Sequence, residues 1–126
     1  MHEFSAMQSI VNTILSKLKE YRVKAVEKVI LEIGKLTFLG SEQLKFAFEV
    51  LTKDTMLEGA ALEILEIEPV VKCEKCGYTG ALQYENADIY HVMLPVFRCP
   101  SCGGKVEVVR GRECAIKSIN MELEED

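Results

Sequence analysis

Apolar residues in the first part of the chain recur at steps of three and four between residues 5 and 21. Polar residues fill the opposite side, which is the pattern of an amphipathic helix with one buried face. We therefore predict that the chain begins with a helix whose apolar side packs into the core. The positions on that side are Met7, Ile10, Val11, Ile14, Leu15, Leu18 and Tyr21.

The pattern changes to a period of two over residues 23–34, which predicts a β-strand that ends at Gly34. Val26 and Ile30 are exceptions to the alternation. A second helix is predicted from residue 41 to about residue 53, with the Ser41 hydroxyl as its N-terminal cap. Residues 60–68 form a second predicted strand, which Pro69 ends.

Two further extended segments are predicted at residues 105–109 and 113–123. The order of elements indicates an α/β (α+β) fold in which two helices cover one face of a three-stranded sheet. Residues 70–108 then form a module inserted before the last strand returns to that sheet. We accordingly predict an α/β domain of residues 1–69 plus 109–126 and a smaller module of residues 70–108.

Two pairs of cysteines lie within the inserted module, Cys73 with Cys76 and Cys99 with Cys102. Two residues between thiolates allow both sulfurs of a tight turn to reach one tetrahedral zinc ion. Four sulfur ligands leave no open position, so the spacing predicts a structural zinc ion in a zinc-ribbon module. Two redox-active disulfides or an iron–sulfur cluster are the alternatives for the same four residues.

The composition limits the partners that the protein can bind and the cellular compartment in which we expect it. The formal net charge is −5, and no stripe of Lys and Arg with interleaved aromatics is present, which argues against nucleic-acid binding. There is no apolar run long enough to span a membrane, and the start lacks the features of a signal peptide. Five cysteines without a secretion signal indicate a reducing compartment, so we expect a cytoplasmic protein.

Cys114 and His2 each have a structural and a functional interpretation. Cys114, in a predicted strand, is either a small buried residue or a reactive thiol. His2 lies directly behind the α-amino group, so the Met1 amine, the His2 amide nitrogen and the His2 imidazole can chelate Ni²⁺ or Cu²⁺. From the chemistry alone, a histidine that happens to lie at a frayed terminus is the favoured explanation.

The order of motifs along the whole chain resembles the HypA/HybF hydrogenase-maturation nickel chaperones. The resemblance rests on the Met1-His2-Glu3 start, the segment Leu31 to Leu36, and the two paired cysteine motifs. It implies a metallochaperone that binds Ni²⁺ as transient cargo through Met1, His2 and Glu3, and that holds structural zinc on its four cysteines. It also implies delivery of nickel to the [NiFe]-hydrogenase large subunit with a HypB-type GTPase as partner; some bacterial members also serve urease.

His91 stays open between a nickel ligand and a packing or surface histidine, because the alignment of its loop with the family is not fixed by the sequence. We expect no enzymatic activity, because nothing resembles a nucleophile–base pair. The rival interpretations are a zinc-ribbon module that binds nucleic acid or the transcription or translation machinery, and a thiol oxidoreductase. A monomer is the default expectation, with a homodimer as the alternative.

Overall fold

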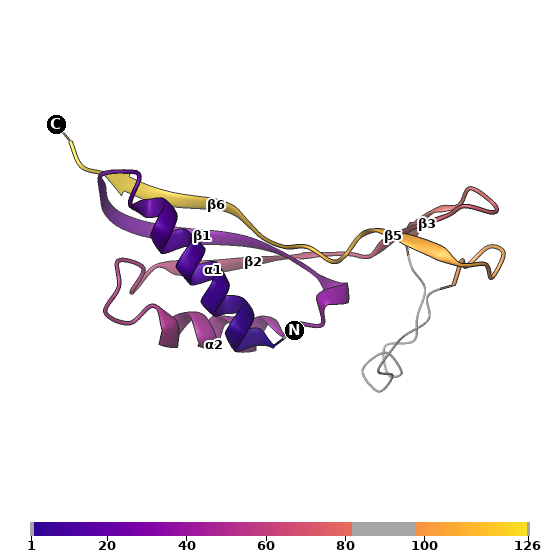
Figure 1. Ribbon diagram of the computed structural model, residues 1–126, viewed down its shortest axis with the longest axis horizontal. Coiled ribbons are helices and arrows are strands. Elements are labelled where there is room, and N and C mark those ends of the chain that lie inside the picture. Colours follow the sequence, from indigo (N-terminus) through magenta and orange to yellow (C-terminus); the bar gives the residue numbers. More distant parts are fainter. Residues whose placement is uncertain (1, 82–97, 126) are drawn as a thin grey trace.

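The computed structural model describes residues 2–81 and 98–125 of the chain (Figure 1). It contains a body of helices and strands from which a smaller sheet extends at one end. The elements of the body are α1 (Glu3–Leu18), β1 (Val23–Gly34), the 3₁₀ turn η1 (Lys35–Thr37), α2 (Ser41–Leu51), β2 (Ala61–Ile67) and β6 (Cys114–Leu123). Those of the smaller sheet are β3 (Val70–Cys73), β4 (Thr79–Ala81) and β5 (Val106–Arg110).

The sheet of the body has the strand order β2-β1-β6. β1 and β2 are parallel, and α2 forms the crossover between them, whereas β6 returns antiparallel on the other side of β1. The last strand therefore pairs with the first, although the whole smaller sheet lies between β2 and β6 in the sequence. The predicted fold class of two helices on a three-stranded sheet with an inserted four-cysteine module is confirmed.

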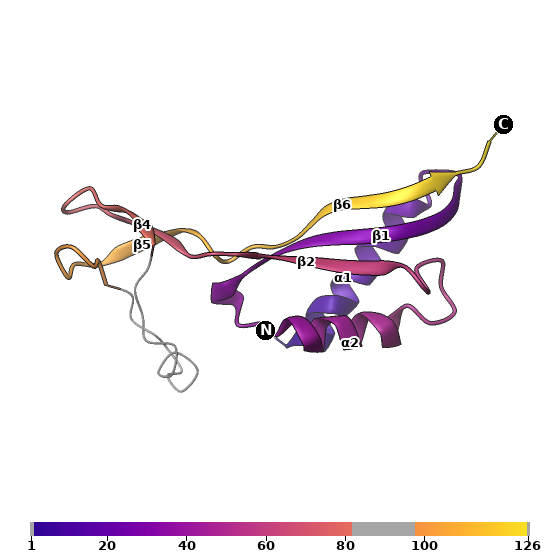
Figure 2. The ribbon, with the colours of Figure 1, turned by 180° about the vertical axis from the view of Figure 1, so that it is seen from behind.

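Helix α1 crosses one face of this sheet, and α2 packs beside α1 on the same side (Figure 1). The view from behind shows the opposite face of the sheet, on which no helix of the described residues lies (Figure 2). Burial of apolar side chains between the helices and the sheet is the main stabilisation of the body. The most completely buried side chains between helices and sheet are Met7, Ile14, Val29, Leu31, Leu44 and Leu57.

The first helix begins and ends earlier than its periodicity predicts. The chain turns after Leu18, with the backbone N–H of Tyr21 donating to the Leu18 carbonyl at 3.2 Å, so Tyr21 lies outside the helix and is 49% exposed. The predicted place of Tyr21 on the buried side is therefore wrong.

The predicted cap of the second helix is wrong as well. Gly40 occupies the cap position, and its carbonyl accepts from the Leu44 N–H at 2.9 Å. Ser41 is the first helical residue, and its hydroxyl donates to Glu66 instead.

The break in alternation along β1 has a structural cause. The pairing of β1 with β6 shifts between Val23 and Ala25 and again between Val26 and Lys28. Each irregularity adds one residue to the strand and reverses which side the next side chain faces. Val23, Val26 and Val29 are consequently all buried, although they are three residues apart.

The junction between the two sheets is a close crossing of backbones. The Gly34 N–H donates to the Glu113 carbonyl and the Leu36 N–H to the Gly111 carbonyl, both at 2.8 Å. A side chain at Gly34 would place its Cβ 2.0 Å from the Gly111 carbonyl oxygen, so only glycine fits. Leu36 then packs with Val71 at the base of the smaller sheet, which fixes the two sheets to each other.

The smaller sheet has the order β4-β3-β5 and is antiparallel throughout. Of its three strands, the sequence predicted only the one near residues 105–109. No helix among the described residues is long and apolar enough to cross a membrane.

Candidate metal centres

The four cysteines of the two pairs come together at the outer end of the smaller sheet. The sulfurs of Cys73 and Cys102 are 3.5 Å apart, as are those of Cys76 and Cys99. All four sulfurs lie within 4.8 Å of one another. A tetrahedral zinc ion with Zn–S bonds near 2.3 Å requires sulfurs separated by about 3.8 Å. The cluster therefore has the size and donor set of a structural zinc site.

Each cysteine pair is presented by the same kind of turn. The Gly77 N–H donates to the Cys73 carbonyl at 3.0 Å, and the Gly103 N–H donates to the Cys99 carbonyl at 2.9 Å. Both glycines have left-handed φ values, 79° and 73°, which L side chains rarely adopt. Glycine at these two positions therefore permits both turns.

The surroundings of the cluster lower the pKa of the thiol at Cys73 and at Cys99 and raise it at Cys102. The backbone N–H of Cys76 lowers the pKa of the Cys73 thiol to about 7. The Gly104 N–H acts to lower the pKa of Cys102, but hydrogen bonds to the sulfurs of Cys73 and Cys76 outweigh it and raise that pKa to about 11. Four thiols so close together cannot all ionise unaided. A divalent cation supplies the charge that full deprotonation needs.

The start of α1 carries a second group of candidate ligands, at the end of the body that faces the smaller sheet (Figure 1). His2 occupies the cap position of α1 in an extended conformation, and its carbonyl accepts from the Ala6 N–H at 2.9 Å. Its imidazole is exposed, and no hydrogen bond among the described residues uses it. The helix thus holds the backbone of His2 while leaving the side chain accessible to an ion.

Glu3 joins the start of α1 to the start of α2. Its Oε2 accepts a hydrogen bond from the Gly40 N–H at 3.0 Å, across 37 positions of the sequence. This bond is the main reason that the pKa of the Glu3 carboxyl lies below its usual value. A hydrogen bond from the backbone N–H of Glu3 itself acts in the same direction. Sequence reasoning missed this contact, because nothing in the local pattern relates residue 3 to a backbone N–H so far along the chain.

A shallow pocket of about 320 Å³ adjoins the terminus between the two helices. It is lined by His2, Glu3 and Phe4 on one side and by Glu42, Gln43 and Phe46 on the other. Phe46 is 64% exposed, which is unusual for a residue of its size.

Two of the predicted nickel residues, Met1 and His91, lie outside the described residues. The two predicted metal centres are separate: the four cysteines lie on the smaller sheet, and His2 and Glu3 lie at the start of α1, at the end of the body nearer to that sheet. Cys114 belongs to neither group. It begins β6, is partly buried, and packs against the apolar core.

Comparison with known proteins identifies the family. A family model described as "Hydrogenase/urease nickel incorporation, metallochaperone, hypA" matches residues 1–121. The chain belongs to the HypA family. A curated relative, the hydrogenase maturation factor HypA of Methanothermobacter thermautotrophicus, is 42% identical over 124 residues, covering 97% of this chain and 98% of that protein. HypA of the bacterium Chlorobium phaeobacteroides is 39% identical over 123 residues, covering 97% and 100%.

Solved HypA structures share the fold. The solution structure of the nickel metallochaperone HypA from Helicobacter pylori superposes with a TM-score of 0.66 and covers 98% of this chain and 100% of that one. A second HypA solution structure gives a TM-score of 0.68 with 98% of each chain covered. Both are 21% identical in sequence, so they support the architecture alone.

Membership of HypA establishes the broad function predicted from the sequence. The chain is a nickel-incorporation metallochaperone of hydrogenase maturation, with zinc as its structural metal and nickel as its cargo. The alternative of a nucleic-acid-binding zinc ribbon is not favoured by any of these similarities.

Proposed function

We propose that this HypA protein binds Ni²⁺ at its N-terminus, through the Met1 amine and the backbone amide and imidazole nitrogens of His2. The observation that carries the proposal is the accessible His2 imidazole at the cap of α1, directly next to the chain terminus. Nitrogen donors in a plane suit Ni²⁺, and three of them leave one position free for exchange with an acceptor.

The role of Glu3 in the nickel site follows from its contact with Gly40. One carboxylate oxygen is held by the Gly40 N–H, so Glu3 fixes the direction in which the terminus leaves α1. Its second carboxylate oxygen or its backbone can complete the coordination of nickel. Glu3 therefore serves the site as a positioning residue, whether or not it also contacts the ion.

The zinc ion belongs to Cys73, Cys76, Cys99 and Cys102, and its role is to hold the turns of the module. Because four sulfurs complete its coordination, it activates no water and performs no chemistry of its own. Residues 1–69 plus 109–126 form the nickel-binding domain, and residues 70–108 form the zinc module. The protein acts in the cytoplasm as a carrier and not as an enzyme.

The receiver of the nickel is the [NiFe]-hydrogenase large subunit, and a HypB-type GTPase takes part in delivery. A monomer carries out this function, since Met1, His2 and Glu3 follow one another at one chain terminus. His91 remains the candidate for a further ligand contributed by the zinc module.

Nickel titration of the zinc-loaded full chain with an authentic Met1 tests the proposal. We expect His2→Ala and N-terminal acetylation each to weaken Ni²⁺ binding at least tenfold, while zinc content stays unchanged. His91→Ala, which removes the other histidine of the chain, tests separately whether the zinc module contributes a further ligand. Equal affinity for the unmodified, acetylated and His2→Ala proteins would show that the terminal site is wrong.

A further inference from the structure

The start of α2 has two hydrogen-bond acceptors beside a single donor. Gly40 is the N-terminal cap of the helix, and its N–H donates to Glu3 Oε2 of α1 at 3.0 Å. Gln43 lies three positions after the cap. In a capping box, the side chain of Glu or Gln at this position folds back and accepts from the N–H of the cap residue. The bond that the sequence of α2 provides for is therefore made by a residue from α1.

The side chain of Gln43 lies over the cap without making that bond. Its Oε1 is 2.0 Å from where a Cβ of Gly40 would be, and Glu3 Oε2 is 3.5 Å from the same point. Among the described residues, the Gln43 side chain makes no hydrogen bond. A side chain at position 40 would displace the amide, so glycine allows both acceptors to remain beside the N–H.

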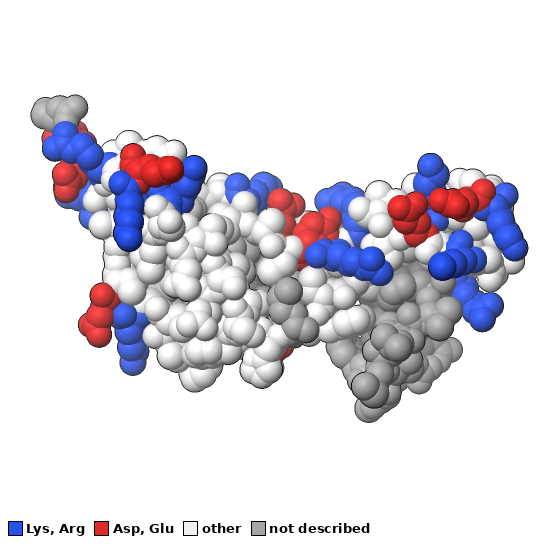
Figure 3. Space-filling view, in the orientation of Figure 1, with Lys and Arg blue, Asp and Glu red and all other residues white. Residues whose placement is uncertain are grey.

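The bond from Gly40 is the main contact that holds the Glu3 carboxylate against α2. No Lys or Arg of the described residues forms a salt bridge with Glu3. On the face shown in Figure 3, the Lys and Arg side chains lie along the rim of the body and on the zinc module, and leave the surface over the helices free. The carboxylate can therefore turn once the Gly40 N–H is released.

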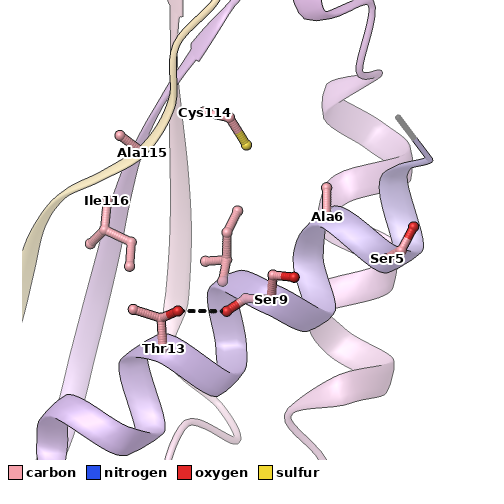
Figure 4. Close-up of a pocket in the computed structure, with 8 residues that line it drawn as sticks. Ser5, Ala6, Ser9, Thr13, Cys114, Ala115 and Ile116 are labelled. Carbon is pink, nitrogen blue, oxygen red and sulfur yellow. Dashed lines mark hydrogen bonds between the residues drawn. The ribbon is translucent and has the colours of Figure 1, made fainter.

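The other side of the first turns of α1 contains no amide or carboxylate that could replace Glu3 at Gly40 (Figure 4). The hydroxyls of Ser5 and Thr13 donate within α1, to the carbonyls of His2 and Ser9. Within the described residues, Gln43 is the side chain that capping geometry places to take over the bond. The residues that line the other side of α1 are Ser5, Ala6, Ser9, Ile10, Thr13, Cys114, Ala115 and Ile116.

An ion at His2 would draw the Glu3 carboxylate away from Gly40. Glu3 and His2 line the same shallow pocket, with Gln43 on its opposite side. Both oxygens of a carboxylate are attached to one carbon, so turning one toward the ion turns the other away from the N–H. An oxygen that shares its charge with a divalent cation is also a weaker acceptor. Without a replacement, the Gly40 N–H would lose its partner at a cost in free energy.

We propose that Gln43 is a positioning residue of the nickel site: it accepts from the Gly40 N–H while the Glu3 carboxylate is turned to Ni²⁺, and it gives the bond back when the ion leaves. The inference rests on the proposed function and adds to it a residue that contacts no ion. The exchange keeps α2 capped in both states. Uptake and release of nickel therefore leave the number of hydrogen bonds at the cap unchanged.

Gln43→Met tests the exchange, because methionine has a similar length and no acceptor oxygen. In the zinc-loaded full chain with an authentic Met1, we expect Ni²⁺ to bind about threefold to tenfold more weakly, since the Gly40 N–H then lacks an acceptor in the nickel-bound state. Calorimetric titration measures the affinity. Gln8→Met makes the same change at an exposed position of α1 and should leave the affinity within about twofold of wild type. Equal affinities for Gln43→Met and wild type would overturn the proposal.

A double-mutant cycle with Glu3→Gln distinguishes the exchange from a general effect on α2. The uncharged side chain of Glu3→Gln can still accept from Gly40, but it is not drawn to the ion. In that background, Gln43→Met should change the nickel affinity by less than about twofold. A loss of affinity as large as in the wild-type background would show that Gln43 acts independently of Glu3, against the proposal.

Hydrogen exchange at the Gly40 amide reports on the bond itself. In wild type, this amide should be protected both without nickel and with it. In Gln43→Met, it should be protected without nickel, where Glu3 is the acceptor, and exchange at least about fivefold faster with nickel bound. Full protection in nickel-loaded Gln43→Met would overturn the exchange.

Failure of the exchange and failure of the proposed function give different results. If the terminal nickel site is wrong, His2→Ala and N-terminal acetylation leave the Ni²⁺ affinity unchanged, and both proposals fall. If the exchange alone is wrong, these two changes still weaken nickel binding, whereas Gln43→Met does not.

Discussion

At the scale of single residues, Glu3 has a structural role as well as a place beside the metal. It links the first turn of α1 to the cap of α2 through the Gly40 N–H, and it is the only acidic residue in the first turn of α1. Hydrogen bonds to a charged acceptor are stronger than those between neutral groups. One carboxylate thus ties the first turn of α1 to the cap of α2.

Glu3→Gln tests this link in the absence of nickel. The change keeps the size of the side chain but removes its charge, and we expect the free energy of unfolding near pH 7 to fall by about 1 kcal/mol. Denaturant unfolding followed by circular dichroism measures the difference between variant and wild type.

The difference in the free energy of unfolding between wild type and Glu3→Gln should also depend on pH. Because folding lowers the pKa of the Glu3 carboxyl, its stabilisation is fully present above the unfolded pKa and is lost as pH falls through the folded pKa. Wild type and Glu3→Gln should therefore converge in acid. A difference that persists after the wild-type carboxyl is protonated would argue against an ionised link to Gly40.

For single residues, prediction from the sequence succeeded where the spacing of residues along the chain alone determines how their side chains can meet. Two cysteines separated by two residues can reach one ion, so the zinc site followed from local pattern. The link from Glu3 to Gly40 could not be foreseen, because it depends on how two helices meet after folding. The nickel residues had an ambiguous chemical signal, and only the family resemblance favoured them over a frayed terminus.

At the scale of elements, the sequence predicted the strands and helices whose burial is periodic. β1, β2, β6 and both helices have apolar patterns long enough to identify. β3 and β4 were missed because they contain only four and three residues, too few to show an alternating pattern in the sequence. The irregular burial of Val26 required knowledge of the pairing with β6.

The crossing of backbones at Gly34 gives a test at this scale. Gly34 has an ordinary φ of −72°, so its requirement is for space and not for an unusual conformation. We expect Gly34→Ala to lower the free energy of unfolding by about 1–3 kcal/mol, as overpacking of a close contact does. It should also shift the NMR signals of Leu36 and Gly111 across the junction.

Gly59→Ala is the contrasting control. Gly59 has a φ of +86° and nothing within 4 Å of where a Cβ would be, so its cost arises from conformation alone, about 1–2 kcal/mol. The changes in the NMR spectrum of Gly59→Ala should be confined to residues near position 59. Undisturbed signals at Leu36 and Gly111 in Gly34→Ala would contradict the close crossing.

At the scale of the whole molecule, the start of α1 and the four clustered cysteines belong to parts of the chain with separate cores. The core between the helices and the larger sheet contains none of the four clustered cysteines. Leu36 and Val71 form a second, smaller buried cluster under the module. Too little apolar surface is buried there to hold the module without its metal.

Zinc removal should therefore affect one part of the chain selectively. We expect a strong chelator, or Cys76→Ser, to abolish the protection of β3 and β5 amides from hydrogen exchange while the amides of α1 and β1 stay protected. Ni²⁺ binding at the terminus should change less than threefold. Cooperative loss of protection throughout the chain would contradict two separate cores.

The central claim is that nickel is bound by nitrogen ligands at the chain terminus and not by the cysteine cluster. X-ray absorption at the nickel edge of the full chain, loaded with one Ni²⁺ and one Zn²⁺, tests it most directly. The account predicts a first shell of nitrogen and oxygen only, with imidazole scattering that disappears in His2→Ala. Sulfur in the nickel shell, or imidazole scattering that His2→Ala leaves unchanged, would contradict it.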